Sequence, residues 1–75
     1  MRILGVRRMK IGIVECSSLK LDYPREARYL YSSPLFRKSL AHAEQECDIV
    51  FILSSKYGLI HPNQVIEPYD EQVSK

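Results

Sequence analysis

Two short polar clusters carry most of the side chains that could bind an anion in this 75-residue chain. The first is Cys16-Ser17-Ser18 with Lys20 close behind, and the second is Ser54-Ser55-Lys56 followed by Tyr57-Gly58. Hydroxyl groups, backbone N–H groups and lysine ammonium groups are the usual donors to a phosphate. Each cluster follows a strand-like apolar run, separated from it by Glu15 in the first case, which is typical of a buried strand that reaches the end of a sheet. In open α/β sheets ligands bind at that end, so the pattern predicts an anion site there.

Tyr57 and Tyr69 extend this hypothesis, because an aromatic ring stacks on any nucleobase without reading its sequence. A structural role is the alternative for every candidate. In that interpretation the tyrosines pack in the fold, the serines satisfy backbone groups where strands end, and Gly58 permits a positive φ in a turn. The clustering of candidates keeps both interpretations open.

Cys16, Glu67 and Asp70 are the residues that could take part in catalysis. Cys16 could act as a nucleophile if a neighbouring lysine lowers its pKa, and the two carboxylates could act as acid or base in N-glycosidic chemistry. A nucleophile also needs a positioned base, and neither His42 nor His61 has an argued place beside Cys16. An enzyme acting on a nucleobase or nucleoside is therefore the alternative to a binding domain.

Two strands and a helix are predicted to position these residues. Lys10–Glu15 and Asp48–Ser54 are rich in β-branched and other apolar residues, the pattern of strands covered on both faces. Gly12 within the first strand indicates that another element packs closely there. Between the strands, Ser33-Pro34 is a typical helix start. The order strand, helix, strand predicts an α/β fold with an open, mostly parallel sheet, in which both polar clusters leave the same edge.

The predicted helix has one apolar face, formed by Phe36, Leu40, Ala43 and Cys47. A short helical turn is also expected after Pro24. Arg37 lies near the positive end of the main helix dipole, where free N–H groups and a cation could attract an anion. The alternative is a solvated surface on which the charge placement has little effect. Arg37 therefore joins the ligand-binding candidates.

Composition limits the classes of function. The net charge of +2 does not by itself indicate nucleic-acid binding. The two cysteines have no metal-binding spacing, so neither a metal nor another cofactor is expected. No apolar run approaches the ~20 residues of a membrane span, and no signal peptide is recognisable. A reduced, cytoplasmic protein without membrane partners is expected.

The domain organisation predicted from the sequence has two parts. Residues 1–9 read as a basic extension or an over-long start, and residues 10–75 as a single α/β domain. Two parallel strands and one helix cannot cover both faces of a sheet. We therefore expect either a homo-oligomer or association with a missing half of the domain. A truncated structural or assembly module is the third functional interpretation.

Four stretches between Cys16 and Val73 carry a family resemblance: C-S-S-L-K-L, A-R-Y-L-Y-S-S-P-L-F-R-K, F-I-L-S-S-K-Y-G-L-I and V-I-E-P-Y-D. With them the chain resembles a family of short, uncharacterised bacterial and archaeal α/β proteins. The tyrosine-glycine segment followed by P-Y is also similar to YaaA-type peroxide-stress proteins and, more distantly, to a domain of archaeosine-modifying enzymes that act on transfer RNA. The resemblance implies an open α/β sheet and a link to nucleobases or nucleic acids. Family members continue beyond P-Y-D, which implies that this chain is the N-terminal part of a longer domain.

Overall fold

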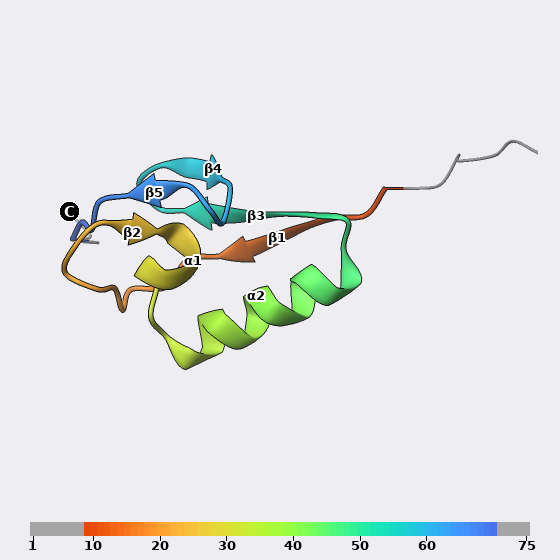
Figure 1. The fold of residues 1–75 in the computed structure, drawn as a ribbon, viewed down its shortest axis with the longest axis horizontal. Helices are drawn as coiled ribbons and strands as arrows, with labels where there is room; N and C mark the ends of the chain where they lie inside the picture. The colour runs from red at the N-terminus through yellow and green to blue at the C-terminus, as the bar shows by residue number, and fades with distance from the viewer. Residues whose placement is uncertain (1–8, 71–75) are drawn as a thin grey trace, which may run out of the picture.

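The computed structural model describes residues 9–70, which form two helices and two small sheets (Figure 1). The larger sheet contains β1 (Ile11–Glu15), β3 (Ile49–Ser54) and β4 (Gly58–Ile60) in the order β1-β3-β4. A second sheet pairs β2 (Arg25–Glu26) with β5 (Val65–Ile66). The helices are α1 (Ala27–Leu30) and α2 (Pro34–Glu46). The predicted basic extension falls on residues 1–9, of which 1–8 lie outside the described part of the chain.

The predicted strand–helix–strand order is confirmed. The connection from β1 to β3 contains α2, preceded by β2 and α1, and the two strands pair in parallel with Ile11 opposite Ile49 and Val14 opposite Ile52. At the end of the pair, the N–H of Cys16 donates to the carbonyl of Leu53 at 3.1 Å. Both polar clusters therefore begin at the same edge of the sheet. The sheet is mixed rather than mostly parallel, because β4 folds back antiparallel to β3.

α2 begins at the residues that the sequence indicates. The Ser33 hydroxyl accepts a hydrogen bond from the N–H of Phe36 at 3.2 Å, and Pro34 is the first helical residue. Phe36 and Leu40 are buried, while Ala43 and Cys47 pack against the same core. A Cβ at Gly12 would lie 2.8 Å from the Cys47 sulfur, which confirms that this glycine permits a close approach of β1 and α2.

The described residues cover only one face of the sheet, although the apolar strands are of the kind that is buried on both faces. α2 packs on the face that carries Val14, Val50 and Ile52, all of which are buried. Strand residues alternate between faces, and four apolar side chains on the other face remain about half exposed: Ile11, Ile13, Leu53 and Leu59. A continuous apolar run predicts burial only if both covering layers exist.

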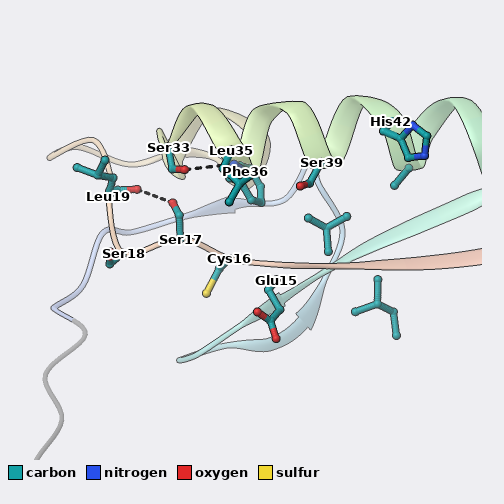
Figure 2. Close-up of a pocket in the computed structure, with 13 residues that line it drawn as sticks. Glu15, Cys16, Ser17, Ser18, Leu19, Ser33, Leu35, Phe36, Ser39 and His42 are labelled. Carbon is teal, nitrogen blue, oxygen red and sulfur yellow. Dashed lines mark hydrogen bonds between the residues drawn. The ribbon is translucent and has the colours of Figure 1, made fainter.

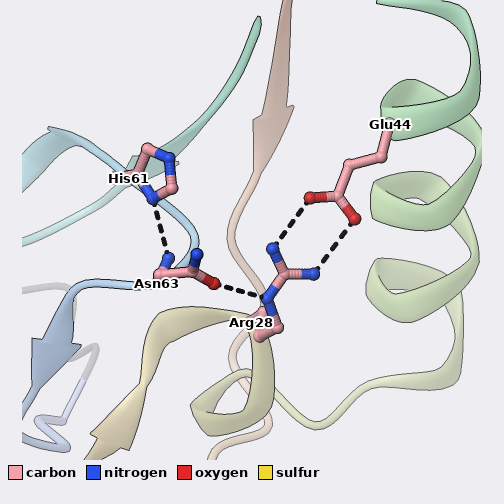
Figure 3. Close-up of polar contacts among 4 residues, drawn as sticks. All are labelled: Arg28, Glu44, His61 and Asn63. Atoms are coloured by element: carbon pink, nitrogen blue, oxygen red, sulfur yellow. Dashed lines mark hydrogen bonds and ion pairs between the residues drawn. The ribbon is translucent and has the colours of Figure 1, made fainter.

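The core lies between the sheet and the helices, and it includes the fully buried Tyr31. α1 is attached to its surroundings by Arg28, whose guanidinium makes two hydrogen bonds to Glu44 of α2 and one to Asn63 (Figure 3). The hydrogen bond to Glu44 raises the pKa of Arg28. Such a partly exposed pair contributes only about 0–1 kcal/mol, so it orients α1 more than it stabilises the fold. No helix within residues 9–70 has both the length and the apolar character needed to cross a membrane.

Candidate functional site at the strand ends

The hydroxyl of Ser54 lies at the centre of the site. Ser54 is the last residue of β3 and is 4% exposed. Its Oγ accepts hydrogen bonds from the backbone N–H groups of Lys56 at 3.1 Å and Tyr57 at 2.9 Å, which fixes the turn into β4. The hydroxyl of Tyr31 donates to the same oxygen at 2.9 Å. Ser54 and these two N–H groups are therefore committed to the fold rather than to a ligand.

Tyr69 joins the ends of both parallel strands. Its hydroxyl lies 2.8 Å from that of Tyr31 and 3.0 Å from both Ser54 Oγ and Ser55 Oγ. It also donates towards Cys16 Sγ at 3.9 Å. Burial is the main cause that raises the pKa of Tyr31 well above its ordinary value, so the Tyr31 hydroxyl stays protonated and remains a donor. We call these five residues the strand-end cluster: Cys16, Tyr31, Ser54, Ser55 and Tyr69.

Two lysines bring their ammonium groups to the ring of Tyr69. Lys20 Nζ lies 4.4 Å from the ring centroid and Lys56 Nζ lies 5.7 Å from it. Lys56 is also 5.3 Å from the ring of Tyr57, which meets Tyr69 edge-on with the centroids 5.6 Å apart. Contacts of this kind hold cations through the negative face of the ring. The ammonium groups of two separate loops therefore lie close to the same tyrosine ring.

Two cavities border the strand ends. The larger, of about 620 Å³, lies between the end of β1 and α2, and its lining reaches along the helix to His42 and Ala43 (Figure 2). In Figure 2 the thiol of Cys16 points away from α2, while Ser17 donates to the carbonyl of Leu19 at 2.8 Å. The smaller, of about 430 Å³, lies beside the Lys20 and Tyr69 contact. It is lined by Ser18, Lys20, Leu21, Asp22, Pro68, Tyr69 and Asp70.

The start of α2 offers less to an anion than its sequence indicates. Ser33 uses its hydroxyl to cap Phe36 and its carbonyl to accept from Arg37, and Pro34 has no N–H. The Arg37 side chain lies apart from the strand-end cluster. It borders a different cavity of about 190 Å³, together with Arg28 and Glu44.

The other predicted ligand-binding residues have defined positions. The Ser18 carbonyl accepts a hydrogen bond from Lys20 Nζ at 3.2 Å. Gly58 has a φ of 77°, which explains a glycine in the turn. The structure brings together seven of the predicted ligand-binding residues. They come from both strand ends and from the loops that follow: Cys16, Lys20, Ser54, Ser55, Lys56, Tyr57 and Tyr69.

The catalytic candidates do not form a recognisable catalytic group. Cys16 contacts hydroxyl groups of Ser55 and Tyr69, whereas His61 Nδ1 accepts the N–H of Asn63 at the far end of the sheet (Figure 3). Glu67 offers its backbone carbonyl to the Tyr57 hydroxyl at 3.2 Å. Asp70 lines the smaller cavity. Within residues 9–70, no group of three His, Cys, Asp or Glu side chains is arranged to hold a metal ion.

Tyr31 is the member of the cluster that the sequence did not identify as a site residue. It follows α1, where its spacing with Ala27 and Leu30 indicates only a core position. Its hydroxyl partners are Ser54 and Tyr69, which are 23 and 38 positions away along the chain. A buried tyrosine usually finds a partner for its hydroxyl, but the sequence does not say which.

Comparison with known proteins assigns the chain to a family, but the function of that family is unknown. A protein-family model matches residues 11–75, and its description is "Family of unknown function (DUF6884)". No curated protein and no solved structure matches the chain.

Proposed function

The chain belongs to the DUF6884 family, whose function is unknown, and from its geometry we propose that it binds a nucleotide or a single-stranded nucleic acid at the strand ends. One observation carries the proposal: Lys20 and Lys56, from the loops after the two parallel strands, converge on the ring of Tyr69. Two ammonium groups near one point create a positive potential that favours a phosphate group.

The lysine side chains supply the anion-binding groups in this proposal. The N–H groups of Lys56 and Tyr57 are occupied by Ser54 Oγ, so they do not form an open backbone anion site. Lys56 is exposed and therefore reaches a ligand without rearrangement of the core. Tyr69 acts as a positioning residue that holds both cations in place.

Tyr57 is the proposed stacking surface for a base. Tyr57 is 36% exposed, its hydroxyl donates to the carbonyl of Glu67, and Lys56 and Tyr69 contact its ring. A ring that is already held in place loses little conformational freedom when a base stacks on its exposed part. Tyr69 is less exposed than Tyr57 and has both Lys20 and Lys56 near its ring.

The smaller cavity fits the remaining part of a nucleotide. Its volume of about 430 Å³ lies within the usual range for small-molecule sites. Lys20 is accompanied there by the carboxyl groups of Asp22 and Asp70, which accept hydrogen bonds from sugar hydroxyl or base amino groups. A ligand that carries both a phosphate and such donors matches this mixture of charges better than inorganic phosphate does.

The proposal is tested by titrating the full chain with nucleoside monophosphates, nucleoside triphosphates and short single-stranded DNA and RNA in low salt. Isothermal titration calorimetry is suitable because it needs no label. We expect saturable binding of at least one of these ligands, weakened as salt is added. An absence of binding across the whole panel would contradict the proposal, provided that circular dichroism shows a folded protein.

A further inference from the structure

The backbone of β1 is paired on only one side within the described residues. The carbonyl of Lys10 accepts the N–H of Ile49, and the N–H of Cys16 donates to Leu53. Alternate residues of a strand direct their N–H and C=O groups to the same neighbour. The even-numbered residues from 10 to 16 therefore face β3, and the backbone groups of Ile11, Ile13 and Glu15 face outwards from the edge of the sheet.

This edge has few of the features that usually prevent strand pairing. Exposed edge strands are commonly protected by proline, charged side chains, a bulge or a very short length, and of these β1 has the charged Glu15 at its end. β1 has five residues, IGIVE, and pairs with β3 in an uninterrupted register. Its outward-facing residues include Ile11 and Ile13, whose side chains are 58% and 56% exposed. A row of unpaired backbone groups selects an extended polypeptide strand, because only a strand matches donors and acceptors at this spacing.

We propose that β1 pairs antiparallel with β1 of a second copy of the chain, around a two-fold axis that passes beside Ile13. In this register Ile13 lies opposite its counterpart, and Ile11 lies opposite the partner's Glu15. The outward groups of these three residues then form about six hydrogen bonds between the two copies. The result is one continuous sheet in which the same edge is used by both copies, as a closed two-fold dimer requires.

Side-chain sizes on the two faces are compatible with this register. On the face covered by α2, Gly12 of one copy lies opposite the partner's Val14, so a residue without a side chain meets a larger one. On the open face, Ile13 of each copy forms a cross-strand pair of β-branched residues, which is a favourable combination in sheets.

The experiment compares two substitutions at Ile13 by analytical ultracentrifugation over a range of protein concentrations. Ile13→Pro removes an outward N–H that does not pair with β3, a position where edge strands tolerate proline. Ile13→Ala keeps that N–H and removes most of the side chain. We expect the wild-type 8.7 kDa chain to form a dimer. Ile13→Pro should weaken that dimer, and its dissociation constant should rise by about thirtyfold or more through loss of two inter-strand hydrogen bonds. The alanine variant should stay within a few-fold of the wild type.

Other outcomes overturn the proposal. A wild-type monomer at all concentrations excludes the dimer. If alanine dissociates the dimer as strongly as proline, the copies associate through the apolar face and not through the edge. If Ile13→Pro does not fold, amide hydrogen exchange of the wild type decides instead. The N–H groups of Ile11, Ile13 and Glu15 should become protected as the concentration rises, and unchanged exchange there counts against edge pairing.

Discussion

The hydroxyl groups of Tyr31 and Tyr69 lie 2.8 Å apart, although 38 positions separate them in the chain. Tyr31 is fully buried behind the ends of the parallel strands, and Tyr69 reaches it from the segment after β5. This contact fixes the ring of Tyr69, which the ammonium groups of Lys20 and Lys56 approach. The contacts that stabilise this end of the fold therefore also position the proposed ligand-binding groups.

Removal of the Tyr31 hydroxyl should destabilise the protein. Tyr31→Phe deletes the donor to Ser54 and a partner of Tyr69, and we expect the free energy of unfolding to fall by about 1–2 kcal/mol. Urea denaturation measures this change. Tyr29→Phe is the matched control, because the Tyr29 side chain is 45% exposed and should change the stability by less than about 0.5 kcal/mol. Equal effects of the two substitutions would contradict the assigned role of Tyr31.

The stability of the protein should also depend on Tyr31 at alkaline pH. Burial raises the pKa of Tyr31 in the folded state above its ordinary value of 10.0. A raised pKa means that the folded state keeps the proton longer than the unfolded state does. The stabilisation is therefore complete below about pH 10 and is lost as the pH rises further, by up to ~1.4 kcal/mol per pH unit. Urea denaturation at pH 8 and pH 11 should show a smaller loss for Tyr31→Phe than for the wild type, and equal losses would refute this dependence.

The two serines at the end of β3 should differ in their effect on stability. Ser54→Ala leaves the N–H groups of Lys56 and Tyr57 without their shared acceptor, and we expect a loss of about 1–3 kcal/mol. Ser55 is exposed and accepts no backbone hydrogen bond in the turn, so Ser55→Ala should cost less than about 1 kcal/mol. Thermal denaturation of the two variants gives the comparison. A larger loss for Ser55→Ala would show that the turn does not depend on Ser54.

Gly12 should be sensitive to a single added methyl group. A Cβ there would lie 2.8 Å from Cys47 Sγ, so Gly12→Ala should push β1 and α2 apart at a cost of about 1–3 kcal/mol. The double variant Gly12→Ala, Cys47→Ala removes the sulfur and tests the cause in a double-mutant cycle. We expect the second substitution to be less harmful in the Gly12→Ala protein than in the wild type. Simple additivity would mean that the contact is not responsible.

The sequence predicted the elements whose determinants are local. Ser33 and Pro34 specify a helix start by their own chemistry, and the structure has α2 begin there. The apolar run before Ser54 correctly indicated a strand followed by a turn at Gly58. The spacing of the two strands around α2 was enough to predict that Cys16 and Ser55 approach one another, and their side chains lie 3.9 Å apart.

Features that depend on distant partners were not predictable in the same way. The exposure of Ile13 depends on which layers cover the sheet, which an apolar run does not specify. β2 was missed because two residues, Arg25 and Glu26, pair with a strand about forty positions away and have no pattern of their own. Arg37 was grouped with the site from its place near a helix start, but Ser33 already satisfies much of that helix end.

The most direct test of the proposed function is the affinity of Lys56→Ala for its ligand, compared with that of the wild type. The probe is whichever nucleotide or single-stranded oligonucleotide binds the wild type, titrated at several salt concentrations. Lys38→Ala is the control. Lys38 lies on the exposed surface of α2, so this substitution removes the same charge at a position away from the strand-end cluster. We predict that Lys56→Ala binds about tenfold more weakly, through the loss of one phosphate contact, whereas Lys38→Ala binds as the wild type does. If both variants weaken binding equally, only net charge matters, and the account of a phosphate site at Lys20, Lys56 and Tyr69 is wrong.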